Sequence, residues 1–297
     1  MKILIVGSKG FIGSYAYRFF SPLHEVWGAD VFNDSDDKNY FRVSNHDTNF
    51  EGIFLENVFD VCINASGNGS VPVSLNLPAL DFDLNVSNTI KLLDAIRMHN
   101  PRCKFINISS AAVYGNPPGL PVTEDMPLLP LSPYGWHKLY AEQICREHYY
   151  LYNLQTINLR LFSVYGEGLR KQLFWDIYQK SSRSLNIELF GSGNESRDFI
   201  YILDLMKAIE CVINRGLFNG EAINVGTGIE TTIREAAKIF CLAINESIMI
   251  KFNKIVRPGD PLNWRADISI LKGFGFEPQT SINDGLLNTA KWLKESK

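Results

Sequence analysis

Short apolar runs alternate with segments of helical periodicity through the first half of the chain. The runs rich in β-branched residues predict five strands, at Lys2–Val6, His24–Asp30, Phe59–Asn64, Cys103–Ile108 and Thr156–Leu161. Apolar positions that recur every three or four residues predict the helices between them, at Phe11–Phe20, Asn85–His99 and Pro133–Tyr152. Near-continuous apolar strands that alternate with helices are typical of a parallel sheet covered on both faces. We therefore expect an α/β fold with a doubly wound parallel sheet.

The pattern loosens beyond Gly166. It predicts helices and strands in a smaller α/β lobe, at Leu169–Lys180, Ile187–Phe190, Ile233–Leu242, Ile248–Phe252 and Ile282–Leu293. We expect residues 1–165 to form the main domain, with 197–226 returning to it. Residues 166–196 and 227–297 are then expected to form the smaller lobe.

Composition excludes several classes of protein. The 297 residues are 45% hydrophobic and 21% charged, as in an ordinary soluble domain. A net charge of -3 gives no basic surface for nucleic acid or an anionic membrane. No run approaches the ~20 apolar residues of a membrane span, and the N-terminal run is interpreted as a buried strand. The five cysteines are scattered without Cys-x-x-Cys spacing, which indicates reduced thiols in the cytoplasm and no metal site.

A glycine-rich segment, Gly7-Ser-Lys-Gly10-Phe-Ile-Gly13, follows the first predicted strand and opens the first predicted helix. Such glycines allow a tight turn and close approach of a pyrophosphate, which the helix N-terminus also attracts. Asp30 ends the second predicted strand, where a carboxylate can bind both adenosine ribose hydroxyls and repel a 2′-phosphate. These features predict an NAD site. A glycine-rich turn without a ligand is the alternative.

Tyr134 and Lys138 lie four residues apart, which places both side chains on one face of the predicted helix. Free tyrosine titrates near pH ~10, and a neighbouring positive charge lowers that value. The pair can therefore take a proton from a sugar or alcohol hydroxyl. Ser132 and Pro133 have the residue types of an N-cap and a first helical position.

These motifs, together with Ser109-Ser110, occur in the order typical of one family. The chain resembles the extended short-chain dehydrogenase/reductases, and within them the NAD-dependent nucleotide-sugar epimerase/dehydratase group, which is UDP-galactose 4-epimerase-like. The resemblance covers nearly the whole length, and four later segments also carry it: Arg160–Gly166, Gly191–Tyr201 with Asp204, Asn224–Gly228 and Arg257–Asp260.

The resemblance implies a Rossmann fold, a bound NAD, a nucleotide-diphosphate sugar as substrate and a homodimer. It implies that Tyr134 removes the proton of the sugar C4 hydroxyl, while Ser110 bonds the C4 oxygen. Lys138 is expected to bond the nicotinamide ribose and to lower the pKa of Tyr134. The expected cofactor-binding residues are Gly7, Gly10, Phe11, Ile12, Gly13, Asp30, Asp47, Ala65, Ser66, Gly67, Asn85, Tyr134 and Lys138. The expected substrate-binding residues are Ser163, Leu189, Phe190, Arg197, Arg257 and Asp260. The two arginines are proposed for the diphosphate because guanidinium groups suit bidentate phosphate contact.

Several positions depart from the pattern of the group. Ala111 and Ala112 stand where sugar-nucleotide 4,6-dehydratases have Asp-Glu, which argues against elimination. Ser163 stands where many epimerases have Asn, and His137 where Ser is common. We expect His137 to be a helix-surface residue and not a second base.

Three functions fit these residues. The first is a redox-neutral nucleotide-sugar epimerase, and the second is an NAD(P)H-dependent reductase of a nucleotide-linked 4-keto-6-deoxyhexose. The third, a non-catalytic cofactor-sensing protein, is disfavoured by the intact Ser110, Tyr134 and Lys138.

Overall fold

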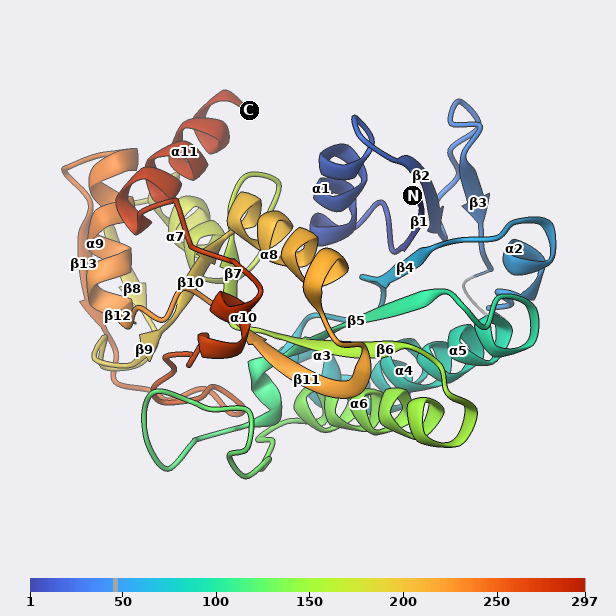
Figure 1. The fold of residues 1–297 in the computed structure, drawn as a ribbon. Coiled ribbons are helices and arrows are strands. Elements are labelled where there is room, and N and C mark those ends of the chain that lie inside the picture. The colour runs from blue at the N-terminus through green and yellow to red at the C-terminus, as the bar shows by residue number, and fades with distance from the viewer. Residues whose placement is uncertain (45–47, 297) are drawn as a thin grey trace.

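The centre of the molecule is a wholly parallel seven-stranded sheet (Figure 1). The computed structural model describes residues 1–44 and 48–296. The strand order is β11-β6-β5-β4-β1-β2-β3. The strands are β1 (Lys2–Val6), β2 (Glu25–Asp30), β3 (Tyr40–Arg42), β4 (Val61–Asn64), β5 (Lys104–Ser110), β6 (Thr156–Leu161) and β11 (Asn219–Val225). The expected doubly wound α/β fold is confirmed.

Helices cover both faces of this sheet. In Figure 1, α1 (Phe11–Phe20) and α8 (Ile202–Arg215) lie above it, and α5 (Asn88–His99) and α6 (Pro133–Tyr152) lie below. The burial of strand β1 on both faces explains why most of its residues are apolar. Its alternate residues belong to two different core clusters, Ile3 to one and Leu4 to the other. A strand that is buried on both faces needs apolar side chains in both directions.

The structure contains short helices and a short strand that the hydrophobic pattern of the sequence did not predict. The edge strand β3 and the single-turn helix α2 (Glu51–Glu56) were not predicted. The stretch before Asn85 forms α3 (Val71–Asn76), α4 (Pro78–Phe82) and a π-helical turn, η1 (Asp83–Ser87). The regular helix α5 therefore begins at Asn88, three residues later than predicted. Helices of one or two turns have too few positions to show a period of 3.6 residues.

The second half of the chain forms helices and two-stranded sheets. The pairs are β10 with β7, β12 with β9, and β13 with β8. The elements are β7 (Ser163–Tyr165), α7 (Gln172–Ser181), β8 (Asn186–Leu189), β9 (Ser196–Arg197), β10 (Phe199–Tyr201), β12 (Thr231–Thr232), α9 (Ile233–Ile244), β13 (Met249–Phe252), α10 (Ser269–Gly273) and α11 (Ile282–Glu295). Two elements that lie between β10 and β12 in the sequence belong to the central sheet instead: α8 packs against α1, and β11 joins the edge of the sheet. The division into two separate lobes stays a prediction.

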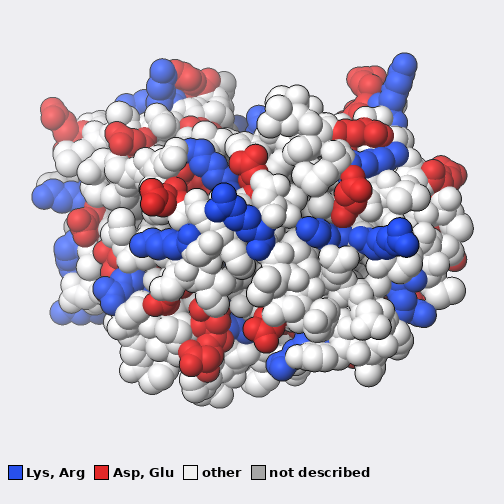
Figure 2. Space-filling view, in the orientation of Figure 1, with Lys and Arg blue, Asp and Glu red and all other residues white. Residues whose placement is uncertain are grey.

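Charged side chains of both signs are interspersed over the face shown in Figure 2. This mixture agrees with the small net charge of the chain. Within the described part of the chain, no helix is both long and apolar enough to cross a membrane.

Candidate active site

The glycine loop joins β1 to α1 at the carboxyl edge of the sheet. Gly7 has φ +83°, and a Cβ there would lie 2.7 Å from the Ser66 nitrogen. A Cβ on Gly13 would lie 2.0 Å from the Gly7 carbonyl oxygen, so no other residue fits this position. Gly10 is the N-cap of α1 and provides no side-chain cap. The first turn of α1 thus keeps its N–H groups free of a side-chain partner, as a phosphate site requires.

Asp30 ends β2 and is tied to this loop. Its Oδ2 accepts a hydrogen bond from the Lys9 backbone N–H at 2.8 Å, and its Oδ1 accepts one from Val31 N–H at 2.7 Å. Lys9 itself forms an ion pair with Asp34. The predicted contact residue Asp47 lies outside the described residues.

Two apolar residues of α1 lie next to the loop. Phe11 packs edge-on against Tyr15, with ring centroids 5.7 Å apart, and a Cβ on Gly168 would lie 3.6 Å from the Phe11 ring. Ile12 is partly buried against the main core. These contacts connect the first turn of α1 to the segment after β7.

The segment after β4 provides the neighbouring wall. Ala65 and Ser66 lie against Gly7, and Gly67 has φ +100°. A Cβ on Gly67 would lie 2.4 Å from Oδ1 of Asn85. That oxygen is buried and has no hydrogen-bond partner among the described residues. A buried amide acceptor without a partner costs free energy, and a ligand with an N–H or O–H group would satisfy it. The glycine loop, Asp30 and this oxygen therefore fit a dinucleotide.

The three predicted catalytic residues meet at the same edge of the sheet. Ser110 is the last residue of β5, and its Oγ accepts a hydrogen bond from Ala112 N–H at 3.2 Å. Tyr134 lies in the first turn of α6, which Ser132 caps through the Gly135 N–H at 3.2 Å. Tyr134 and Ser110 form a side-chain hydrogen bond. The predicted N-cap at Ser132 is confirmed.

Burial and two neighbouring side chains act on the pKa of Tyr134. Burial raises the pKa of Tyr134, the Ser110 hydrogen bond lowers it, and the negative charge of Asp81 raises it, with a net value above the ordinary one. Lys138 is not one of the causes of this shift, so the expectation that it lowers the pKa of Tyr134 stays a prediction. Desolvation of the phenol is the largest cause of the raised pKa, and the Nζ of Lys138 lies 5.9 Å from the centroid of the Tyr134 ring.

Lys138 is buried, and its Nζ donates a hydrogen bond to the Ile108 carbonyl at 2.9 Å. Burial lowers the pKa of Lys138 to about 8, although the charges of Asp81 and Glu142 raise it. The charge of Lys171 lowers it further.

His137 is buried, at 8% exposure, so its expected place on the helix surface is wrong. Its Nδ1 forms an ion pair with Oδ2 of Asp81, which is fully buried on α4. The prediction failed because α4 was not foreseen. The sequence signal for it was Pro78, which stands at the start of this helix three residues before Asp81.

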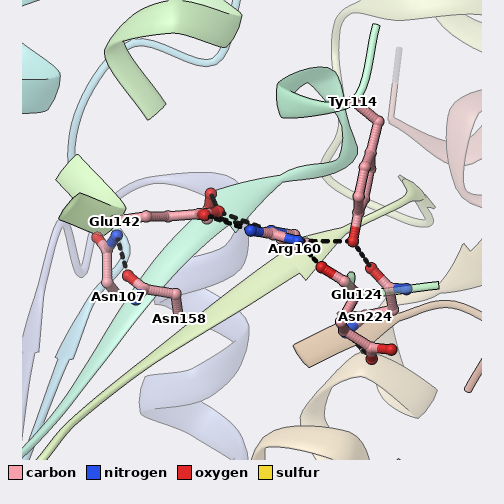
Figure 3. Close-up of polar contacts among 8 residues, drawn as sticks. Asn107, Tyr114, Glu124, Glu142, Asn158, Arg160 and Asn224 are labelled. Carbon is pink, nitrogen blue, oxygen red and sulfur yellow. Dashed lines mark hydrogen bonds and ion pairs between the residues drawn. The ribbon is translucent and has the colours of Figure 1, made fainter. Parts of the chain in front are cut away.

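A buried polar network fixes α6 against the sheet (Figure 3). Arg160 of β6 donates to both oxygens of Glu142 on α6, with the shortest bond 2.8 Å, and to the Tyr114 hydroxyl at 2.8 Å. Tyr114 donates in turn to Oδ1 of Asn224 at 2.7 Å. Ser109, next to Ser110 on β5, donates to Glu142 at 2.5 Å. The network thus joins the strand of Ser110 to the helix of Lys138.

The two arginines proposed for the diphosphate differ in environment. Arg197 stacks over Trp264 at 5.4 Å, and burial lowers its pKa to about 10 although Asp260 raises it. Arg257 is exposed and forms an ion pair with Asp260 at 3.1 Å. A Cβ on Gly259 would lie 3.3 Å from the Ser132 side chain, so the turn between Arg257 and Asp260 lies beside the start of α6.

The other predicted substrate-binding residues differ in how exposed they are. Phe190 is 41% exposed and lies under Arg257, with the guanidinium 4.9 Å from the ring centroid. Leu189, in contrast, is buried in the core, and its carbonyl accepts a hydrogen bond from Asn253 N–H. Its side chain is therefore not available to a ligand. Ser163 begins β7 and is partly buried.

Lys171 is a further cation near the site, next to an arginine that faces elsewhere. Its Nζ would lie 3.3 Å from a Cβ on Gly69, and desolvation lowers its pKa although much of the side chain is exposed. The neighbouring Arg170 instead lies over Trp175 and Trp292. The sequence alone could not separate these two adjacent cations.

The sheet, the glycine loop and the converging hydroxyl, phenol and amine define a Rossmann-type dinucleotide enzyme. Residues 3–226 match the model of the NAD-dependent epimerase/dehydratase family. The chain belongs to this family, whose members are NAD-dependent enzymes acting on nucleotide sugars.

The chain is similar to curated relatives along its whole length. It is 28% identical over 308 residues to a putative UDP-glucose 4-epimerase of Methanocaldococcus jannaschii, with 99% of each chain covered. It is 30% identical to an uncharacterized UDP-glucose epimerase of Bacillus subtilis, with 99% of this chain and 98% of that one covered.

Solved structures have the same fold. The UDP-glucuronic acid 4-epimerase of Bacillus cereus, in complex with UDP-glucuronic acid and NAD, has a TM-score of 0.90 and 27% identity, with both chains fully covered. The UDP-N-acetylglucosamine 4-epimerase of Methanobrevibacter ruminantium has a TM-score of 0.89 and 27% identity. The alignment covers 100% of this chain and 99% of that one.

Proposed function

We propose that this protein is a nucleotide-sugar 4-epimerase that acts through transient oxidation at C4 of the sugar. The observation that carries the proposal is the meeting of Ser110, Tyr134 and Lys138 at the carboxyl edge of the sheet, beside the glycine loop. Neither Ala111 nor Ala112 offers a carboxylate for an elimination, so oxidation and reduction are the chemistry that suits this site.

Each catalytic residue has a role that follows from its contacts. When bound, NAD would supply the hydride acceptor for oxidation at C4 and, in its reduced form, the hydride donor for the return step. Tyr134, as the phenolate, takes the proton of the C4 hydroxyl. Its hydrogen bond with Ser110 lowers the pKa of the phenol and so favours the phenolate. Lys138 adds positive charge behind the phenol from a position fixed by the Ile108 carbonyl.

The proposed substrate is a nucleoside diphosphate sugar. Arg197 and Arg257 are close enough for the charge of one to lower the pKa of the other, and their two positive charges suit a diphosphate. The ion pair of Arg257 with Asp260 would open on binding, which frees the Asp260 carboxylate for a ribose hydroxyl. Phe190 is proposed to contact the base.

A second candidate is the reduction of a nucleotide-linked 4-keto-6-deoxyhexose. Ser163 favours it, because a hydroxyl replaces the amide that many epimerases have at this position. The same three catalytic residues would serve this reaction, with NAD(P)H consumed as substrate.

The test is turnover with a panel of nucleotide sugars, for the wild type and Tyr134→Phe. We expect NAD to stay bound through gel filtration and the wild type to epimerise C4 without net consumption of NADH. Tyr134→Phe should lose turnover by about 10²–10⁴-fold while still binding NAD. Stoichiometric NADH oxidation would instead support the reductase.

Tyr150→Phe is the matched control, since Tyr150 lies on the same helix and is 59% exposed. It should leave turnover unchanged. Activity retained by Tyr134→Phe would rule out the assignment of Tyr134 as the base.

The homodimer stays a prediction. The helices α5 and α6 expose large apolar side chains, among them Ile90, Met98, Trp136 and Tyr140. Light scattering of the purified protein would test it.

A further inference from the structure

One buried carboxylate beside the catalytic residues has no part in the proposed reaction. Asp81 is 0% exposed, and its Oδ1 accepts hydrogen bonds from the side-chain amides of Asn68 at 2.5 Å and Asn85 at 3.1 Å. Its Oδ2 faces Nδ1 of His137. Its negative charge raises the pKa of both Tyr134 and Lys138.

The partners of Asp81 determine the state of the imidazole. A carboxylate only accepts hydrogen bonds, so Nδ1 of His137 carries the hydrogen. The rings of Phe82 and His137 pack edge to face at nearly a right angle, with their centroids 5.4 Å apart. This contact holds the imidazole in place. His137 directly precedes Lys138, so this contact joins α4 to the catalytic turn of α6.

The same reasoning orients the Asn85 amide. Its Nδ2 lies near two atoms that can only accept, the Asn68 carbonyl at 3.3 Å and the Asp81 carboxylate at 3.1 Å. The group between them must therefore be the NH₂. The amide oxygen is then turned toward Gly67, where it is buried and has no hydrogen-bond partner in the part of the chain that the structure describes.

We propose that Asp81 and His137 form a positioning pair that holds the Asn85 amide oxygen toward the cofactor site, where it accepts a hydrogen bond from a donor group of NAD. His137 fixes Asp81, and Asp81 fixes Asn85. The inference rests on the NAD dependence within the proposed function, and it assigns no proton transfer to His137.

The test is a double-mutant cycle on NAD affinity, measured by calorimetry on protein freed of cofactor. Asp81→Leu keeps the branched shape but accepts no hydrogen bond, and Asn85→Leu removes the amide oxygen. We expect each single change to weaken NAD binding on the order of tenfold to a hundredfold. Because Asp81 acts through Asn85, the double variant should bind no more weakly than Asn85→Leu alone.

Two changes at His137 provide an independent arm that leaves Asp81 in place. His137→Asn retains an N–H group near the position of Nδ1, whereas His137→Leu does not. His137→Asn should therefore bind NAD several-fold more tightly than His137→Leu, on the order of fivefold. This arm decides the question if Asp81→Leu does not fold.

Asp83→Asn is the control, because Asp83 is exposed and its carboxylate accepts a hydrogen bond from Ser87 in its own turn. Its NAD affinity should equal that of the wild type. Additive losses in the double variant, or equal affinities of the two His137 variants, would overturn the proposal. The titration needs the cofactor alone, so a failure to find epimerase turnover would sink the proposed function without changing this result.

Discussion

Two buried carboxylates join the catalytic helix α6 to its surroundings, Glu142 from α6 itself and Asp81 from α4, and their partners differ. Glu142 is 3% exposed and pairs with Arg160, whose guanidinium is permanently charged. Asp81 pairs with the imidazole of His137 and with two amides. The Glu142 pair is therefore held by a guanidinium, whereas the Asp81 carboxylate is held by hydrogen-bond donors on three separate side chains.

The two pairs also differ in what they act upon. Burial alone lowers the pKa of Arg160, but Glu142 reverses this effect and the pKa lies above its ordinary value. Asp81 raises the pKa of Tyr134 as well as Lys138, whereas Glu142 acts on Lys138. We infer that the Glu142 pair holds the fold and that the Asp81 pair serves the site.

The largest expected effect on stability comes from breaking the Glu142 pair. Arg160→Met leaves a buried carboxylate without its cation, which typically costs about 3–5 kcal/mol. Urea unfolding would measure the loss. His137→Leu should cost less, because Oδ1 of Asp81 keeps its bonds from the Asn68 and Asn85 amides and only Oδ2 loses its donor.

Adding Glu142→Leu to Arg160→Met should restore part of the lost stability, because the stranded carboxylate is then removed. Equal losses for Arg160→Met and His137→Leu would contradict the division of roles between the pairs.

The second prediction concerns pH and Lys138. The pKa of this amine is about 8 in the folded protein and 10.5 for an ordinary lysine of an unfolded chain, so between these pH values the unfolded chain binds more protons. Stability therefore rises with pH across this window, and the penalty for burying the charge is complete below it. The whole gain is about 3 kcal/mol.

The measurement is the unfolding free energy of the cofactor-free wild type minus that of Lys138→Met, from neutral pH upward. Buried tyrosines and cysteines titrate in both proteins, so their contributions cancel in the difference. A difference that stays constant from about pH 8 to about pH 10.5 would contradict the lowered pKa.

The smallest effect is expected at Ser109. Its hydroxyl donates to Glu142 at 2.5 Å, and Arg160 still neutralises that carboxylate when the hydroxyl is removed. Ser109→Ala should cost about 1.5–3 kcal/mol of stability, the usual range for a hydrogen bond to a charged group. A loss as large as that of Arg160→Met would show that Ser109, and not the cation, holds Glu142.

Long periodic segments made most of the fold predictable. The strand β1 and helix α1 begin and end at the predicted residues, because the glycines of the loop between them punctuate the pattern. The helix α4 was missed because one turn shows no period, and the edge strand β3 was missed because it has only three residues.

The site was predictable where function depends on one local motif. Ser110, Tyr134 and Lys138 each belong to a short motif, and the ends of β5 and α6 bring them together. Asp81 and His137 were not foreseen as a pair because they are 56 residues apart, and only tertiary packing joins them. The burial of Leu189 was likewise not visible, since its strand alternates inward and outward residues.

The place of β11 has a consequence for how the protein is made. All six residues of β6 are buried, and its outer edge is paired by a strand that begins only at Asn219. As the chain leaves the ribosome, the backbone groups along one edge of β6 stay unpaired until β11 has been synthesised. A fragment that stops before Asn219 should therefore associate with other chains through this edge. The central sheet is thus completed late in translation, because all residues between β6 and β11 are synthesised before β11 can pair with the edge of the sheet.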